Sequence, residues 1–577
     1  MSAEIQKDVG TAFTSRESAA VSLGQDVEKE NIDDDSGQVA KKWRGTRADQ
    51  QDMAALGKKQ VLRRNFKFVT MLGFASTAMA SWELLLPLFT FVMIDGGTAD
   101  LFWGFIVAAS GMCLVYASIA EMASISPTAG GQYHWVSEFA PPNIQKILSY
   151  VVGWLCAIGW QVYLAGVCFM IGGILQGLVA LNKVDYVYEP FHATLLAIAV
   201  VTFSVVFNTS LAERLPLIEG IILILHLIGF FVIIIPLWVM GPRGDPNVVL
   251  LNFTNEGGWS SKGLAAMIGL TSPMSVLIGY DCSVHLSEEI QDASWVVPRA
   301  IMWSVGPNAT MGFLMAVTLI FTIGDLDSVL NSVTGQPFMQ VFYNATQSYA
   351  ATNVMCVVVV ILLLSCCVSE VAAASRQIWS FARDGGLPGS NWLSQVSPGW
   401  NIPLRSVCVS IAVSSLLSLI NLGSSVALNA INSLGGVSIL CSYYITISCL
   451  IWRRTQGPLP AHRWSLGKYG MVVNIASLCF LTPITFFAFW PLQTPVTAQN
   501  MNWSSVMFVG TLIVALIYYY FKARHKHDFL ILVMENLGFC MLSFGHQTSL
   551  ISIAENCSCI YLLPDQSSTI EFMSLRR

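Results

Sequence analysis

Long runs of hydrophobic residues, separated by short polar segments, occupy the chain from Phe66 to Tyr520. A helix needs about 20 predominantly apolar residues to cross the hydrocarbon core of a bilayer, and runs of this length recur about a dozen times. The pattern predicts an all-α polytopic membrane protein with about 12 transmembrane helices. We expect the spans at residues 66–94, 101–124, 147–181, 192–209, 216–240, 263–287, 298–323, 351–378, 403–421, 426–452, 469–491 and 503–522.

The composition supports this reading. Hydrophobic residues make up 54% of the chain and charged residues only 11%, whereas soluble domains are about a quarter charged. The net charge of −5 says little about partners, because the location of charge matters more than its sum. We expect the lipid bilayer as a partner and no nucleic acid. Most of the 14 cysteines lie inside apolar spans, where they act as small hydrophobic residues, so we expect no metal and no cofactor.

Basic residues are distributed unequally between the two sets of loops. The basic N-terminal segment leads into the first span, and the loops on that side are the richer in Lys and Arg, which predicts that this side is cytoplasmic. An even number of spans then places both termini in the cytoplasm. The default location is the plasma membrane, with the vacuolar membrane as the alternative. The sequons at Asn252, Asn344 and Asn502 fall in predicted outside loops and are candidates for glycosylation.

The chain divides into three regions. Residues 1–65 carry an acidic patch and then a basic stretch, which predicts a disordered cytoplasmic tail. Residues 66–522 form the twelve-helix domain. Residues 523–577 form an atypical tail to which we assign no function, because its apolar stretch contains Glu535 and Asn536 and is too short for a thirteenth span.

Two predicted spans contain features that permit a helix to unwind. The first, residues 66–94, is longer than a crossing needs and contains "GFASTAMASWE". In the sixth, Ser272, Pro273 and Ser275 precede "LIGYD". A helix can break at membrane depth only where protein or water satisfies the freed backbone groups, and paired breaks in two halves of a transporter indicate a midplane binding site. The alternative is ordinary packing of helices through small residues.

Three stretches of mixed polar and small residues border the predicted spans: "SIAEMASISPTAGGQYHWVSEFAP" (118–141), "GYDCSVHLSEEIQDASWVVPRA" (279–300) and "ASRQIWSFARDGGLPGSNWLSQVSPGWNIP" (374–403). They resemble the amino acid–polyamine–organocation (APC) superfamily, and within it the fungal amino acid/choline transporter family of GABA, choline and polyamine permeases. They are similar to family blocks that follow the second span, end the sixth and follow the eighth. With the matching order of spans, the resemblance covers about residues 66–525.

The resemblance implies a LeuT-like core of two five-helix repeats with inverted topology, plus two further helices. It also implies that unwound backbone in spans one and six cradles the substrate. The superfamily usually has glycines at the first break, and this chain has none there. The substrate-binding residues that we expect are Met79, Ala80, Ser81, Trp82, Ser275, Ile278, Gly279, Tyr280 and Asp281.

Ionisable residues inside spans are functional candidates by default. His226 lies in the middle of span five, and proton-coupled relatives in the superfamily carry a basic side chain at a similar place. The alternative is a histidine that simply donates to a backbone carbonyl. Glu370 in span eight is the second candidate for proton coupling. Glu288 and Glu289 lie near the predicted cytoplasmic mouth, where we expect ion pairs with Arg376 or Arg383 that hold an inner gate shut; the alternative is that the two acids carry protons.

These expectations describe a secondary active transporter of a small nitrogenous solute (an amino acid, GABA, choline or a polyamine) with protons as the coupling ion. The alternatives are an importer or exporter of a nitrogenous secondary metabolite, an uncoupled facilitator and a non-transporting sensor. A membrane-embedded enzyme is not expected, because the chain has no His-Glu-x-x-His stretch, phosphate-binding loop or nucleophile elbow.

Overall fold

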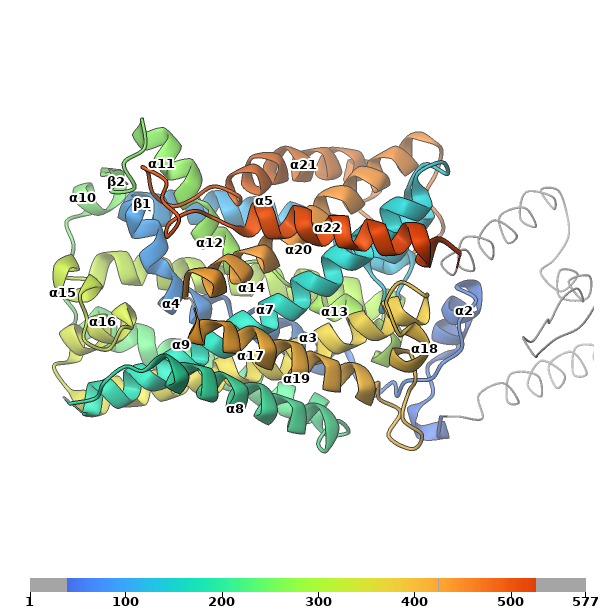
Figure 1. Ribbon diagram of the computed structural model, residues 1–577, viewed down its shortest axis with the longest axis horizontal. Coiled ribbons are helices and arrows are strands. Elements are labelled where there is room, and N and C mark those ends of the chain that lie inside the picture. The colour runs from blue at the N-terminus through green and yellow to red at the C-terminus, as the bar shows by residue number, and fades with distance from the viewer. Residues whose placement is uncertain (1–38, 184, 424, 526–577) are drawn as a thin grey trace, which may run out of the picture. The chain divides into compact units, whose positions relative to one another are not determined.

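The computed structural model describes residues 39–183, 185–423 and 425–525 (Figure 1). Within these residues, 11 helices are long and apolar enough to cross a membrane, and they follow the predicted spans. The first is the pair α3 (Phe68–Met79) and α4 (Ser81–Ile94), counted as one span. The others are α5 (Gly97–Ile125), α7 (Gln145–Asn182), α8 (Pro190–Thr209), α9 (Leu215–Met240), α14 (Ala293–Thr322), α17 (Tyr349–Arg383), α19 (Leu404–Leu419) with η3 (Ile420–Leu422), α20 (Ser425–Thr455), η4 (Gly467–Tyr469) with α21 (Gly470–Phe487), and α22 (Ser504–Phe521).

The predicted sixth span, residues 263–287, is divided into short pieces. They are α11 (Lys262–Gly269), α12 (Thr271–Ser275) and α13 (Cys282–His285), followed by η2 (Ser287–Glu289). Each piece is too short to cross a bilayer alone. This divided segment and the 11 spans together account for the 12 predicted crossings.

The helices pack as two sets of five with two additions. The second span (α5) packs against the seventh (α14), and the third (α7) packs against the eighth (α17), so corresponding helices of the two sets are in contact. Helix α3 packs against α9, α14 and α17. The first span therefore lies between span five and two helices of the second set. The last two spans, α21 and α22, lie against α5, α7 and α20 (Figure 1).

Short elements connect the spans. On one side lie α10 (Pro246–Leu251), α15 (Leu326–Leu330), α16 (Pro337–Thr346) and a two-stranded antiparallel sheet, in which β1 (Asp95–Gly96) pairs with β2 (Thr254–Asn255) (Figure 1). On the other side lie α2 (Arg47–Ala55), α6 (Gln132–Phe139), α13 and α18 (Ser390–Leu393). We call these the sheet side and the α2 side.

The prediction of a disordered tail over residues 1–65 is wrong for residues 39–65. Thr46 and Asp49 form a capping box at the start of α2, and the chain then runs under the spans to a parallel bridge between Phe66 and Ile290. The polar composition suggested disorder, but several of the charges in this segment have buried partners. Residues 1–38 lie outside the described residues, as do residues 526–577, which include the stretch rejected as a thirteenth span.

Asp49 joins this segment to span seven. Its carboxylate accepts the backbone N–H groups of Asp292 (2.8 Å) and Ala293 (2.9 Å) at the start of α14. It also accepts from Arg64 Nη1 at 3.1 Å, and both side chains are buried. A carboxylate at a helix N-terminus satisfies free N–H groups and opposes the positive end of the helix dipole.

Substituting Asp49 with alanine is expected to destabilise the protein by about 3–5 kcal/mol, because Arg64 keeps its buried charge but loses its carboxylate. The measurement is thermal unfolding of the detergent-solubilised protein. Gln51→Ala is the control, because Gln51 lies on the same helix but is exposed. Equal unfolding temperatures for the two variants would contradict a structural role for this segment.

Candidate functional site

Span one breaks at Ala80. Helix α3 ends at Met79, Ala80 adopts a left-handed conformation (φ 40°, ψ 44°), and α4 begins at Ser81. Residues other than glycine, Asn and Asp rarely adopt this conformation, so contacts with the surrounding protein must stabilise Ala80 in it. The freed carbonyl of Ala78 accepts the thiol of Cys366 at 3.2 Å. The break lies where the family resemblance placed it, but it is one residue long.

Span six is unwound between Ser275 and Tyr280, and two tyrosines bind its backbone. Tyr116 donates to the carbonyl of Leu277 (2.9 Å) and accepts the N–H of Gly279 (2.9 Å). Tyr163 donates to the carbonyl of Ser275 at 3.1 Å. Gly279 has φ 114°, a conformation that only glycine adopts readily. The freed groups therefore have the protein partners that an unwound segment needs at membrane depth.

Asp281 ends the unwound segment and is fully buried. Its carboxylate accepts from Gln132 Nε2 at 2.5 Å and from the Tyr443 hydroxyl. His285 Nε2 lies 3.6 Å away, one turn further along the chain. Tyr280, beside it, packs edge-on against Tyr116 with ring centroids 4.8 Å apart. Asp281 is thus held by side chains of α6 and α20 and lies near a histidine of its own helix, α13.

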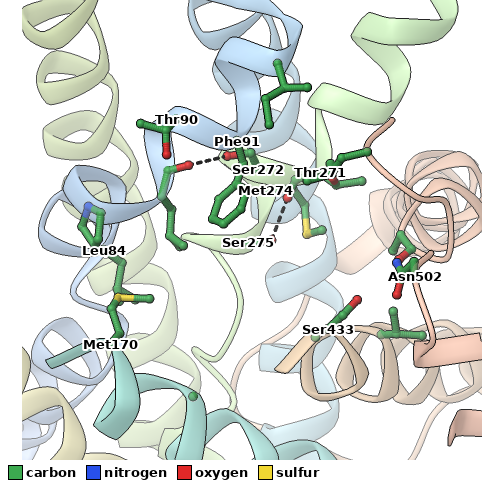
Figure 2. A pocket seen from close by; sticks show the side chains of 18 of the residues that line it. Leu84, Thr90, Phe91, Met170, Thr271, Ser272, Met274, Ser275, Ser433 and Asn502 are labelled. Carbon is green, nitrogen blue, oxygen red and sulfur yellow. Dashed lines mark hydrogen bonds between the residues drawn. The ribbon is translucent and has the colours of Figure 1, made fainter. Parts of the chain in front are cut away.

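A cavity of about 830 Å³ lies on the sheet side of the two breaks, since its lining includes Ile94 at the end of α4 and Gln336 just before α16. Its walls come from α4, α7, α12, α20 and the segment 487–502, as Figure 2 shows for Leu84, Met170, Ser275 and Ser433. We call this cavity the vestibule.

Only two of the nine expected binding residues line the vestibule, namely Ser275 and Ile278. Trp82 packs against the rings of His226 and Phe230, with centroids 5.9 Å away in each case. The other expected residues are buried beside the breaks, as Trp82 is: Met79, Ala80, Ser81, Gly279, Tyr280 and Asp281.

His226 makes two side-chain bonds inside the protein. Its Nδ1 lies 2.6 Å from Glu83 Oε1 in the first turn of α4, and its Nε2 lies 3.1 Å from Asn308 Oδ1 on α14. The Asn308 side-chain amide donates to the carbonyl of Ser76 (3.1 Å), and the backbone carbonyl of Asn308 accepts from Ser81 Oγ (2.8 Å). The histidine therefore bonds to side chains rather than to a backbone carbonyl, and it connects span five to both sides of the break in span one. Glu83 was not among the expected site residues, although an acid directly after the break was a visible signal.

A second buried acid on α9 escaped the sequence reasoning. Glu219 lies seven residues before His226, which is about two turns, and so on a similar face of the helix. Its carboxylate accepts from Thr77 Oγ1 (2.6 Å) on α3 and from Ser369 Oγ (2.9 Å) on α17. Gly73 permits the close approach, because a Cβ there would lie 2.7 Å from the Glu219 carbonyl oxygen.

Glu370 is buried in α17 beside the first break. The Cys366 thiol, which contacts the Ala78 carbonyl, also lies 3.7 Å from Glu370 Oε1. Glu370 Oε2 has no hydrogen-bond partner among the residues that the structure describes.

The α2 side is closed by ion pairs. Glu288 accepts two bonds from Arg383 (2.8 and 2.7 Å), and Glu289 accepts from Arg376 Nε at 2.6 Å. Burial alone would raise the pKa of Glu288, but the charge and hydrogen bonds of Arg383 outweigh it and hold the pKa at about 2. Each expected acid therefore has its own arginine.

The N-terminal segment adds to this closure through Lys58. Lys58 Nζ lies 3.5 Å from Asp384 Oδ2 and donates to Thr128 Oγ1 at 3.2 Å. Asp384 also accepts from the Tyr133 hydroxyl at 2.8 Å. Burial lowers the pKa of Lys58; it would raise that of Asp384, but the charges of Lys58 and Arg383 outweigh it and lower the pKa of the carboxyl.

The three sequons differ in accessibility. Asn252 is exposed at the end of α10. Asn344 lies within α16, where its side chain bonds to Gln340 and Ser328. Asn502 lines the vestibule and donates to the carbonyls of Ala488 (3.0 Å) and Trp490 (3.1 Å).

We therefore expect Asn252 to be the one sequon of the three that carries a glycan. Asn252→Gln should remove the mobility shift that a glycosidase produces in the protein expressed in a eukaryotic cell. Asn344→Gln and Asn502→Gln are the matched variants and should keep the full shift. A shift lost only with Asn502→Gln would show that the vestibule wall is open to the glycosylation machinery.

Comparisons with known proteins agree with this architecture. The family model for amino acid permeases matches residues 66–514. A protein of Macrophomina phaseolina, named as an amino acid/polyamine transporter, is 31% identical over 440 residues, which cover 75% of this chain and 97% of that protein. The choline transporter of Saccharomyces cerevisiae is 29% identical (81% and 82% covered), and amino-acid permease 2 of Neurospora crassa is 28% identical (82% and 88% covered).

A solved structure shares the fold. The manganese transporter of Eremococcus coleocola superposes with a TM-score of 0.50 over 79% of this chain and 95% of that one, at 11% identity. This likeness concerns the LeuT-like arrangement of helices and not the cargo. The match over residues 66–514 concerns the sequence itself, and its relatives are permeases rather than enzymes. The chain therefore belongs to the amino acid permease family of the APC superfamily and is a multi-pass transmembrane transporter.

Proposed function

We propose that this protein is a secondary active transporter that moves a small nitrogenous solute by alternating access and couples this movement to protons. One observation carries the proposal: two broken spans meet below a vestibule that is open on the sheet side, while buried ion pairs close the α2 side. This is the arrangement that a carrier needs when its central site faces one side of the membrane only.

We take the α2 side as cytoplasmic, in agreement with the excess of Lys and Arg in its loops, and the plasma membrane as the location. The vestibule then faces outward. Solute enters it and reaches a floor that includes Ser275 and Ile278. When the vestibule floor opens, the solute is proposed to contact the buried residues from Met79 to Trp82 and from Gly279 to Asp281.

Coupling is proposed to act through His226 and Glu83. Their bond of 2.6 Å joins span five to the first turn of α4, directly beside the break. Histidine is the side chain whose charge ordinarily changes between pH 5 and 8. Gain or loss of a proton at this pair changes the attraction between α9 and α4, and so biases the position of the outer half of span one.

The inner gate is proposed to consist of Glu288–Arg383 and Glu289–Arg376. Both acids follow the break in span six and both arginines lie at the end of α17. Inward opening requires these pairs to separate, so their strength sets how long the vestibule-facing state persists.

The test is uptake by proteoliposomes of labelled amino acids, GABA, choline and polyamines, with and without an inward proton gradient. We expect one of these solutes to accumulate above equilibrium with the gradient and to lose the excess when a protonophore is added. Uptake that stops at equilibrium would identify a facilitator. Binding without any flux would identify a sensor.

A further inference from the structure

We infer that the cargo is a small organic cation without a carboxylate group, and that the Glu370 carboxylate supplies its counter-charge. The inference rests on the proposed function and narrows it to one substrate class. Amino acids and GABA carry a carboxylate and choline and polyamines do not, so the two groups differ in what the site must offer.

A substrate carboxylate would favour free helix N-termini, and at both breaks an acid of the chain already lies there, although neither acid's side chain bonds to the N–H groups of the helix. Broken transporter helices bind anionic groups at the positive ends of half-helices. Here α4 begins at the first break with Glu83 in its first turn. The short helix α13 begins at the second break with Asp281 as its N-cap residue. A carboxylate placed at either end would face a carboxylate of the protein.

Basic side chains near the breaks are also engaged, as far as the described residues show. His226 is bonded to Glu83 and to Asn308. His285 lies 2.9 Å from the Ala129 carbonyl through Nδ1 and 3.6 Å from the Asp281 carboxylate through Nε2. The arginines at the inner end of α17 already pair with acids: Arg376 with Glu289 and Arg383 with Glu288. Each of these basic groups therefore faces an acid of the chain itself, and of their nitrogens named here only His285 Nε2 is without a hydrogen bond in the described residues.

Glu370, in contrast, lacks a partner of opposite charge. Its side chain is buried, and its Oε2 accepts no hydrogen bond from the described residues. The Cys366 thiol, which donates to the carbonyl freed at the first break, lies 3.7 Å from Glu370 Oε1 and so places Glu370 beside that break. A buried carboxylate without a counter-ion is costly, and a cation bound beside the first break offsets that cost.

Aromatic rings complete the arrangement. Tyr163 lines the vestibule, and Trp160 lies 3.6 Å from the position of a Cβ on Gly279. Faces of Trp and Tyr attract ammonium groups, above all when water is excluded. We propose that a cation that passes Tyr163 then approaches the Trp160 ring and the Glu370 carboxylate, because the carbonyls of Ser275 and Leu277 are already bonded to Tyr163 and Tyr116.

The first test uses the wild-type protein and two matched pairs of solutes. Choline and glycine betaine share a trimethylammonium group and differ by a carboxylate; putrescine and GABA differ by a carboxylate in place of an ammonium. In the pair that competes better, we expect the solute without a carboxylate (choline or putrescine) to compete at least about tenfold more strongly than its counterpart (glycine betaine or GABA). Stronger competition by glycine betaine or GABA would overturn the inference and leave the proposed function intact. Absence of flux for every solute would contradict both.

The second test replaces Glu370 with glutamine, which keeps the shape and removes the charge. Cation affinity should fall at least about tenfold, with Glu370→Asp recovering part of it. Glu213→Gln is the matched control, because Glu213 lies outside the spans with 55% of its side chain exposed. If Glu370→Gln keeps the preference for cations and only flattens the pH dependence, the carboxyl carries a proton and the inference is wrong. If this variant fails to fold, the wild-type comparison still decides.

Discussion

Replacing His226 with alanine is expected to abolish uphill accumulation under a proton gradient while leaving exchange of solute across the membrane measurable. The substitution removes the titratable group that links span five to Glu83 and Asn308. It also leaves Glu83 buried without its nearest partner, at a cost of about 3–5 kcal/mol. Both effects act on the break in span one, where the proposed coupling takes place. The measurement is the ratio of internal to external solute at steady state, with and without a protonophore.

His192→Ala is the control for this experiment. His192 is also a histidine bonded to a side chain, that of Tyr186, but it lies at the start of α8, away from the breaks. Glu83→Gln should behave like His226→Ala, because the pair acts as one unit. Uphill accumulation that survives in His226→Ala would remove this residue from the coupling mechanism, whatever the solute.

The spans were predictable because hydropathy depends only on the local run of residues. The fourth and fifth spans were expected at 192–209 and 216–240 and are found as α8 (Pro190–Thr209) and α9 (Leu215–Met240). Helix ends extend beyond the apolar window, as in α17, which continues to Arg383. At that end the polar side chains face other parts of the protein rather than lipid.

The breaks were predictable in position but not in extent. Small residues around Ala80 and the glycine at position 279 marked where each helix could open, and the family resemblance supplied the register. How far each one opens depends on its partners. Tyr116, on span two, holds the unwound backbone of span six at Leu277 and Gly279. Nothing in the local pattern of span two distinguishes this tyrosine from one that packs in the core.

Pairings between distant residues were the part that sequence reasoning could not supply. His226 and Glu83 are 143 positions apart, and each looked like an isolated group in its own span. Glu219 was overlooked for the same reason: its donors, Thr77 and Ser369, lie on two other helices. The buried charges of residues 39–65 are a third example. Their polar composition predicts disorder as long as the buried partners of the charged side chains are unknown.

Replacing Glu288 with glutamine is expected to open the inner gate and to lower the uptake rate. The pKa of Glu288 lies near 2 instead of its usual 4.5. This difference means that the paired state favours the ionised carboxylate by about 3 kcal/mol at neutral pH over a carboxyl in water. The variant should therefore expose the α2 side, which faster hydrogen exchange in residues 283–290 and 376–386 would report. Arg383→Gln should act in the same direction. The change in gating free energy in the double variant should be smaller than the sum of the two single changes, because both substitutions remove the same interaction.

The pH dependence of this variant separates the gate from the coupling site. A carboxyl whose pKa is lowered contributes its full stabilisation above pH 4.5, and this contribution is lost only as the pH falls toward 2. Between pH 5 and 8 the Glu288–Arg383 pair therefore stays charged and adds no pH dependence of its own. Glu288→Gln should slow uptake equally across this range and keep the response to a proton gradient, whereas His226→Ala should lose that response. The opposite pattern, with a pH response lost in Glu288→Gln and kept in His226→Ala, would mean that protons act at the inner mouth and that the break in span one serves the solute alone.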